Sequence, residues 1–501
     1  MTSIRAAWTT AVAGLCAVLL APLLIVDVPP LLDYPNHLAR VFVLASLPHD
    51  PVLARFYTAH WSIIPNLALD LVGPPLLRVL PVHVAGRLLI AAAVLLPVLG
   101  AIAYNRAIGG RWWSFGAGFM AYNSCLLAGF LNFEIAIGLA MLLAAAWLRW
   151  REDRPARAIA LAAAGALVLF ACHLMGLVFL AALIGGAELP RLRRDPTGWP
   201  RRAGALAAVF APPVVLYAIS GLRQLGGDAS FLPLGPKLLQ LATVFVNYHW
   251  PLDMATAAAV IALSIACLSL RRGRMPAPAA AACLLLLVAF LAAPFAWKGT
   301  YALDTRFAVM LGFMLFAGFV PTRWPPVLRR VAVGGLLLLF AVRMALLMAA
   351  WWAHRADLAD LLAVLAPVQP GQSVYVAEAA LQEAPRYWAA NPGWRLLSDG
   401  ARTDEHLGAL VLIEHRAYWP FEFDNPSQQP METREPYRTL AMRVGNLPGR
   451  AEAAMADLCG FDYVLLLAAD AVPSLPAERF RLLRQSGFAA LYAVTQCLPD
   501  H

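Results

Sequence analysis

Residues 158–189 read AIALAAAGALVLFACHLMGLVFLAALIGGAEL, an apolar run with His173 near its middle. As one helix this run would be about 48 Å long at 1.5 Å per residue, whereas the hydrocarbon core of a bilayer is about 30 Å thick. The length predicts a hairpin of two membrane helices that turns around residues 172–176. The same reasoning divides residues 113–148, about 54 Å long as one helix, at residues 129–134.

The positions of the arginines support both hairpins. Arginines gather in the loops at residues 106–111, 149–157, 191–202, 271–274 and 323–330, while the two hairpin turns carry no Lys or Arg. Cytoplasmic loops of membrane proteins are enriched in Lys and Arg. With a cytoplasmic N-terminus, the hairpins place all of these loops inside, whereas one long helix in either place would put an Arg-rich loop outside.

Composition agrees with a polytopic membrane protein. The chain has 501 residues, of which 61% are hydrophobic and 14% charged, and its mean hydropathy is +0.66. Further membrane spans are predicted at residues 6–26, 82–104, 203–221, 254–270, 276–297, 307–320 and 331–352, which gives about eleven spans with the four hairpin arms. The net charge of +9 lies in short loops, and no nucleic-acid motif accompanies it, so we expect no nucleic-acid partner.

The predicted fold is mainly α. A helical bundle with a long first outer loop at residues 27–81 occupies residues 1–352, and a small extracytoplasmic α/β domain follows at residues 353–501. In that domain we predict strands at residues 373–377, 463–467 and 489–494, helices at residues 356–365, 403–414 and 478–485, and a long loop at residues 418–437. The sequence leaves open whether Cys459 and Cys497 form a disulfide.

The residues just after the first span form a candidate active site. Asp33, His37 and Arg40 are spaced i, i+4 and i+7, so they share one helix face if Pro35 opens a helix. The simpler alternative is that Asp33 only caps that helix and that His37 and Arg40 are ordinary interfacial side chains.

Other ionisable residues are predicted at the same outer depth of the membrane, where such groups usually mark a site. They are Glu134, His173, Lys298, Asp304 and Arg306. Four of them have a structural alternative: Glu134 as an N-cap or first-turn acid, His173 as a turn residue bonded to backbone carbonyls, and Asp304 and Arg306 as a local ion pair. Arg343, inside the last span, either snorkels or pairs with a carboxylate or a phosphate.

These groups suit transfer of a sugar from a lipid-linked phosphate. The phosphate needs cations, and the acceptor hydroxyl needs a carboxylate as general base. Three short segments carry a resemblance to a known family: residues 32–37 (LDYPNH), 171–176 (ACHLMG) and 304–307 (DTRF). With the predicted topology, they resemble the GT-C superfamily of integral-membrane glycosyltransferases, which includes oligosaccharyltransferases, protein mannosyltransferases and lipid A aminoarabinose transferases.

The resemblance implies a bacterial inner-membrane glycosyltransferase with a polyprenyl-phosphate sugar as donor. It implies a catalytic acid in the first outer loop, which agrees with Asp33 as the general base. The chemistry of the donor assigns its phosphate to Arg40, Arg306 or Lys298, and the topology places the C-terminal domain in the periplasm. His37, Glu134, His173 and Asp304 are further candidates for substrate binding. The acceptor, whether glycan, lipid or protein, is not specified.

The sequence shows no metal-binding motif in the first outer loop, and two alternative functions remain open. The first outer loop contains no Asp-x-Asp or Glu-x-Asp pair, so no cofactor is predicted, and a divalent metal is an option that no motif supports. The same polar groups would also suit a transporter or flippase of lipid-linked intermediates, or a non-catalytic scaffold for envelope assembly. Transport predicts polar residues on the inner half of the spans as well, and few are found there.

Overall fold

The computed structural model describes residues 2–322, 324–378, 394–444, 449–450, 458–471 and 474–496. Its contacts divide the chain into two compact units. Unit 1 comprises Met1–Leu24, Ile63–Ala68 and Leu89–Leu347, and unit 2 comprises Ile25–Ser62, Leu69–Leu88 and Met348–His501. Most of the first outer loop thus belongs to the same compact unit as the C-terminal region.

Eight helices in the described residues are long and apolar enough to cross a membrane. They are α1 (Thr2–Leu20), α5 (Val82–Ala107), α7 (Leu131–Trp150), α8 (Pro155–Cys172), α9 (Leu174–Arg194), α10 (Trp199–Ile219), α13 (Trp250–Ser269) and α16 (Pro326–Leu365). The chain is therefore a multi-pass membrane protein. The hairpin predicted within residues 158–189 is confirmed, because α8 ends and α9 begins on either side of His173.

The remaining predicted spans are shorter or less regular. Residues 276–297 and 307–320 correspond to α14 (Ala277–Ala292) and α15 (Leu303–Ala317). The predicted helical arm at residues 113–128 is wrong in detail, since it is a 3-10 helix, η2 (Trp112–Met120), followed by a single turn, α6 (Ser124–Leu127). Glycine and aromatic residues, which have low helix propensity, fill η2. The predicted turn is present, with Gly129 at φ +86° just before α7.

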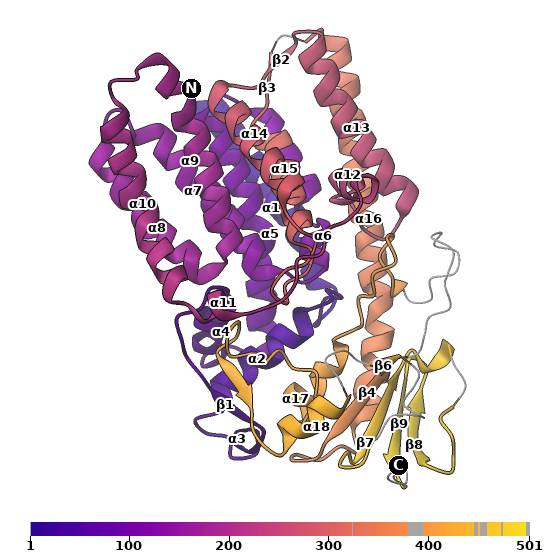
Figure 1. Ribbon diagram of the computed structural model, residues 1–501. Coiled ribbons are helices and arrows are strands. Elements are labelled where there is room, and N and C mark those ends of the chain that lie inside the picture. The colour runs from indigo at the N-terminus through magenta and orange to yellow at the C-terminus, as the bar shows by residue number, and fades with distance from the viewer. Residues whose placement is uncertain are drawn as a thin grey trace. The chain divides into compact units, whose positions relative to one another are not determined.

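Glycines allow the helices of unit 1 to approach closely. Helix α9 packs against α7 and α14, and α8 packs against α7 and α10 (Figure 1). A Cβ at Gly138 on α7 would lie 2.4 Å from the carbonyl carbon of Leu96 on α5, and one at Gly186 on α9 would lie 2.5 Å from the amide nitrogen of Ala282 on α14. A larger residue at either position would push two helices apart.

Shorter elements complete unit 1. They are η1 (Ala21–Leu24), α11 (Gly221–Gln224), α12 (Leu234–Thr243), β2 (Gly273–Arg274) and β3 (Val320–Pro321). Helix α12 packs against α13 and α15. It therefore contacts two helices that follow it in the chain.

Unit 2 combines helices with a five-stranded sheet of order β6-β4-β7-β9-β8. The strands are β4 (Val374–Glu378), β6 (Gly449–Arg450), β7 (Tyr463–Leu467), β8 (Phe480–Ser486) and β9 (Ala489–Val494). Strand β4 is parallel to β6 and β7, whereas β9 is antiparallel to β7 and β8. The other elements are α2 (Tyr34–Ser46), α3 (Leu53–Phe56), β1 (Tyr57–Ala59), α4 (Ala68–Leu77), η5 (Leu407–Ala409), α17 (Leu410–His415), β5 (Met431–Thr433), α18 (Tyr437–Val444) and η7 (Ala469–Ala471).

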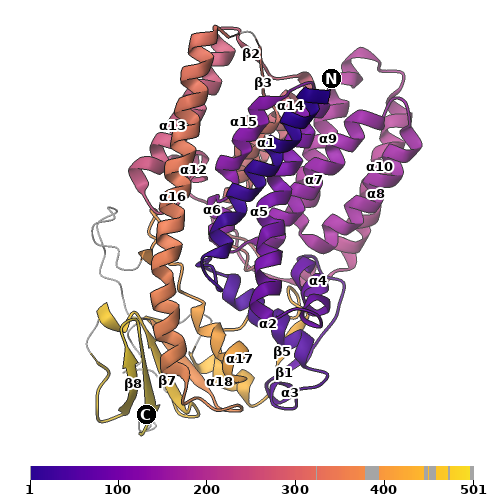
Figure 2. The ribbon, with the colours of Figure 1, turned by 180° about the vertical axis from the view of Figure 1, so that it is seen from behind.

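The three predicted strands of the C-terminal region are confirmed, and its predicted helices need correction. The helix expected at residues 478–485 is wrong, because this segment is the edge strand β8, whose pairing with β9 overrides its helical pattern. The helix expected at residues 356–365 is the end of α16, which runs unbroken for 40 residues (Figures 1 and 2). The helix expected at residues 403–414 begins only at η5.

Two segments that are distant in sequence join within unit 2. Strand β1 of the first outer loop pairs antiparallel with β5, with Tyr57 opposite Thr433. The loop predicted at residues 418–437 therefore contains a strand. Cys459 is disulfide-bonded, and Cys497, the partner considered from the sequence, lies outside the described residues.

Candidate functional site

Asp33 stands at the start of α2 without capping it. Pro35 lies in the first turn of the helix, where its missing N–H costs nothing, and Asp33 occupies the N-cap position with helical φ and ψ and no side-chain cap hydrogen bond. Its Oδ1 instead lies 3.3 Å from Nε2 of His406, and its side chain is 16% exposed. The carboxylate is thus directed toward the C-terminal region and not toward its own helix.

Arg40, on the same helix face, is fully buried and paired. Its Nε donates to Oδ1 of Asp70 at 2.7 Å and its Nη2 donates to Oδ2 at 3.2 Å, while Nη1 lies 3.2 Å from Nδ1 of His37. Such a bidentate pair is the strongest form of Arg–carboxylate contact. The structure therefore brings Asp33, His37 and Arg40 together as their spacing predicts, and Asp70 already occupies the Arg40 fork.

Asn36 joins α2 to an extended segment of the C-terminal region. Its Nδ2 donates to the carbonyl of Phe421 at 2.8 Å, and its Oδ1 accepts from the amide of Phe423 at 3.1 Å. These two bonds hold the backbone on both sides of Glu422. The Glu422 side chain is 6% exposed, and neither of its carboxyl oxygens has a hydrogen-bond partner among the described residues.

Aromatic rings lie between the two histidines. The Phe423 ring is 5.5 Å from the His37 ring and 5.1 Å from the His406 ring, and Trp419 lies 6.1 Å from His406. We call the following residues the α2 cluster: Asp33, Asn36, His37, Arg40, Asp70, His406, Glu422 and Phe423. Asp33, His37 and Phe423 are partly exposed and the other members are buried, so the cluster has an accessible side and a buried floor.

Burial sets the protonation of two members of the cluster. It lowers the pKa of His37 well below the usual value, and the charges of Arg40 and His406 lower it further. Burial also raises the pKa of Glu422 well above the usual value; the Arg40 charge opposes this shift and the Asp424 charge adds to it. Both side chains are therefore favoured in their neutral forms.

The polar residues of unit 1 form a second, buried group. Glu134, in the first turn of α7, accepts a hydrogen bond from Asn123 Nδ2 at 2.9 Å. His173 caps α9, with Nδ1 accepting from the amide of Met175 at 3.1 Å. Its expected bond to a backbone carbonyl is thus replaced by one to a backbone amide, and the structural alternative for this residue is supported.

Arg306 lies in the same region as His173 and Glu134. Its guanidinium stacks 4.4 Å from the centre of the Phe130 ring, Nη1 donates to the carbonyl of Tyr301 at 2.9 Å, and its charge acts on His173. The charges of Glu134 and Arg306 both act on Cys125. The structure therefore gathers these three predicted site residues in unit 1.

Asp304 and Lys298 have other partners. Asp304 accepts from Gln240 Nε2 at 3.1 Å, and Lys237 Nζ lies 3.8 Å from its Oδ2, so the ion pair expected with Arg306 is replaced by one with Lys237. Lys298 donates to the carbonyls of Arg223 and Leu222 at 2.8 and 3.4 Å.

Of the alternatives considered for Arg343, the structure shows pairing with a carboxylate. Its Nη1 donates to Oδ1 of Asp253 on α13 at 2.5 Å, and its Nη2 donates to the carbonyl of Phe245 at 2.7 Å. Oδ2 of Asp253 accepts from the amide of Asn247 at 2.8 Å. Arg343 therefore joins α16 to α13 as a structural element.

No protein-family model matches the chain, and no curated protein matches it by sequence. Among solved structures, ArnT from Cupriavidus metallidurans bound to undecaprenyl phosphate is similar, with a TM-score of 0.50 and 12% identity. The similarity covers 97% of this chain and 97% of ArnT. The chain has the fold of ArnT. The polytopic helical fold expected from the sequence is thereby confirmed.

Five members of the α2 cluster were not predicted from the sequence: Asn36, Asp70, His406, Glu422 and Phe423. Asn36 and Asp70 lie in the first outer loop, and His406 lies in the segment predicted as a helix at residues 403–414. Glu422 stands in the run YWPFEFD at residues 418–424, where an acid among aromatic residues was a usable signal. In the part of this ArnT-like fold that the structure describes, no group of three or more His, Cys, Asp or Glu side chains is placed to hold a metal ion.

Proposed function

We propose that this ArnT-like chain is an inverting membrane glycosyltransferase. It transfers a hexose or pentose from a polyprenyl-phosphate donor to an acceptor on the outer face of the bacterial inner membrane, with a cytoplasmic N-terminus and a periplasmic C-terminal region. The observation that carries this proposal is the Asp33 carboxylate, which is partly exposed, does not cap its helix and lies beside His406. A carboxylate held in this way is suited to act as a general base.

In the proposed reaction, Asp33 takes the proton of an acceptor hydroxyl. The acceptor oxygen forms a bond to the anomeric carbon as the bond from that carbon to the phosphate oxygen breaks, and polyprenyl phosphate leaves with the electron pair. In this reaction we assign the His406 proton to Nε2, which lies 3.3 Å from Oδ1 of Asp33, so that Oδ2 is left for the acceptor. His406 is then a positioning residue.

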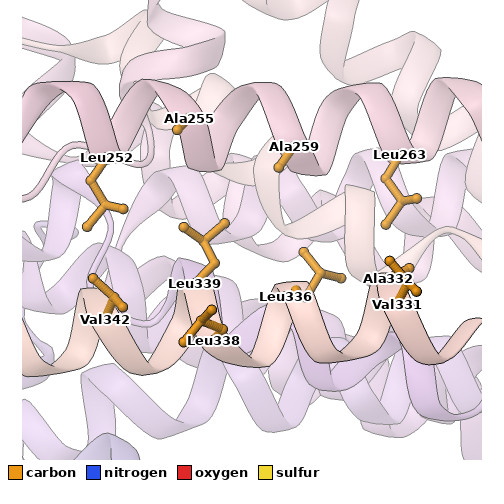
Figure 3. Close-up of a pocket in the computed structure, with 11 residues that line it drawn as sticks. Leu252, Ala255, Ala259, Leu263, Val331, Ala332, Leu336, Leu338, Leu339 and Val342 are labelled. Carbon is orange, nitrogen blue, oxygen red and sulfur yellow. The ribbon is translucent and has the colours of Figure 1, made fainter.

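An apolar groove in unit 1 supports a lipid donor. It lies between α13 and α16, has a volume of about 580 Å³ and is lined by side chains such as Leu252, Leu263, Leu336 and Val342 (Figure 3). Branched hydrocarbon chains suit such a surface, because nothing in the lining requires a hydrogen bond. The ArnT structure holds undecaprenyl phosphate, and we assign the groove in this chain to a polyprenyl tail.

Arg306 is our candidate for the donor phosphate. A guanidinium presents a planar fork to phosphate oxygens, and this one lies in the buried group with His173 and Glu134. Arg40 is a poorer candidate, because its fork is occupied by Asp70.

The test uses the purified full chain in lipid nanodiscs with labelled undecaprenyl-phosphate hexoses and pentoses. Asp33→Asn is expected to lower the rate of undecaprenyl phosphate release by about 10³-fold, the scale of general-base catalysis, with an unchanged melting temperature. Arg306→Met is expected to raise KM for the donor by about tenfold. Asp27→Asn is the matched control, because this acid of the same loop is 69% exposed and pairs only loosely with Arg87 at 3.2 Å.

The outcomes separate the candidate functions. Full activity of Asp33→Asn would remove Asp33 from the mechanism. If the unaltered protein moves the labelled lipid between leaflets without cleaving it, the flippase alternative replaces the transferase.

A further inference from the structure

The α2 cluster has more carboxyl groups than cations to balance them. Arg40 is its fixed cation among the described residues, and Asp70 engages the guanidinium through two nitrogens. Asp33 is then left without a fixed cation, whereas Glu422, whose carboxyl group is favoured in its neutral form, adds hydrogen-bonding capacity and no charge. An anionic ligand entering this cluster would meet the Asp33 carboxylate and an arginine that is already neutralised.

Glu422 also has hydrogen-bonding capacity that the described residues leave unused. A buried carboxyl group normally has hydrogen-bond partners, yet both oxygens of Glu422 have none in the described part of the chain. The backbone that carries this side chain is held in place, because Asn36 bonds to it on both sides of Glu422. A fixed, buried and unsatisfied carboxyl group is suited to a ligand that can both donate and accept hydrogen bonds, and a hydroxyl group does so.

Resting on the glycosyltransferase function proposed above, we infer that the acceptor is uncharged where it enters the α2 cluster. The acceptor is a sugar or another polyol whose hydroxyl groups bind Glu422 and whose carbon skeleton packs on Phe423, and it is not a phosphate or a carboxylate. Phe423 is partly exposed between the His37 and His406 rings, so its ring is available for this contact.

The proposed reaction also favours a hydroxyl group as the acceptor. A hydroxyl group is a weak nucleophile until a base removes its proton, whereas a phosphate or carboxylate oxygen is already ionised at neutral pH. An acceptor of the second kind would gain nothing from Asp33 and would be repelled by it. A cluster with an available carboxylate and no available cation among its described residues therefore selects a hydroxyl acceptor.

The experiment compares two probes that differ by one phosphate group, octyl β-glucoside below its micellar concentration and octyl β-glucoside 6-phosphate. The full chain in nanodiscs is given labelled undecaprenyl-phosphate sugar, and glycoside products are counted. We expect kcat/KM for the neutral probe to be at least tenfold higher. Equal or better use of the phosphorylated probe, or no effect of the neutral probe on donor turnover, would overturn the inference.

Variants of Glu422 test its part in binding. Glu422→Ala is expected to raise KM for the neutral probe at least tenfold, with a smaller change in kcat. Glu422→Gln keeps a hydrogen-bonding side chain of the same shape and is expected to recover most of the lost affinity for the probe. Glu478→Gln, at an exposed position, is the matched control. The same KM in Glu422→Ala and the unaltered protein would contradict the assignment.

This design distinguishes the inference from the function on which it rests. The loss of undecaprenyl phosphate release in Asp33→Asn tests whether Asp33 is the general base. The preference between the two probes tests the class of acceptor. Ligand-observed NMR with the same two probes reports binding without turnover. Binding of the phosphorylated probe in preference to the neutral one would overturn the inference even if the donor were never cleaved.

Discussion

Two buried Arg–Asp pairs, one in each unit, differ in what surrounds them. Around Arg343 and Asp253 in unit 1, a threonine hydroxyl, a backbone carbonyl and a backbone amide complete the hydrogen bonds. Around Arg40 and Asp70 in unit 2, neighbouring side chains are partly exposed, and Glu422 has no partner in the described residues. A buried charge by itself therefore does not mark a site. The mark of a site that we propose is a buried carboxyl group without a partner beside partly exposed side chains, as at Glu422.

The largest expected effect comes from breaking the pair of unit 1. Arg343→Met removes the cation that faces Asp253 and is expected to lower the free energy of unfolding by about 3–5 kcal/mol, measured by denaturation in detergent. Donor cleavage per folded molecule should not change. The double variant Arg343→Met with Asp253→Leu should recover most of the stability. Lost cleavage with normal stability would instead make Arg343 a functional residue.

The contact between Asp33 and His406 is expected to affect activity and not stability. His406→Ala should lower kcat about 10- to 100-fold, because a hydrogen bond to a charged group contributes about 1.5–3 kcal/mol. His406→Gln, whose amide nitrogen can occupy the position of Nε2, should restore most of kcat. If both variants unfold at the same lower temperature and lose activity equally, His406 is a packing residue.

The smallest expected effect is the pH dependence that His37 confers. Because its pKa is lowered in the folded protein, the unfolded chain binds a proton at His37 below about pH 6.5 that the folded protein does not. The contribution of His37 to the free energy of unfolding should be constant above pH 6.5. Below that pH it should decrease as the pH falls, by at most about 1.4 kcal/mol per pH unit.

A comparison of variants isolates this contribution. His37→Asn should reduce the loss of stability between pH 6.5 and pH 5, as measured by thermal denaturation. His49→Asn, at an exposed position of the same loop, should keep the pH profile of the unaltered protein. Identical profiles for all three proteins would show that His37 is protonated equally in the folded and unfolded states.

Patterns within single segments could be read from the sequence. The hairpin at His173, the shared face of Asp33, His37 and Arg40, and the strands at residues 463–467 and 489–494 follow from length, spacing and hydrophobicity. The 3-10 helix η2 and the edge strand β8 were not predicted, because packing and strand pairing override local preference there.

The sequence by itself determined that this chain is a polytopic membrane protein and where its helices turn, because apolar length and arginine position are local properties. Only the tertiary structure decided which acids meet which cations. Asp33 with His406, Asn36 with the backbone around Glu422, and Arg343 with Asp253 join residues from about 90 to about 390 positions apart. Such pairings depend on the path of the folded chain, and no periodicity in the sequence records them.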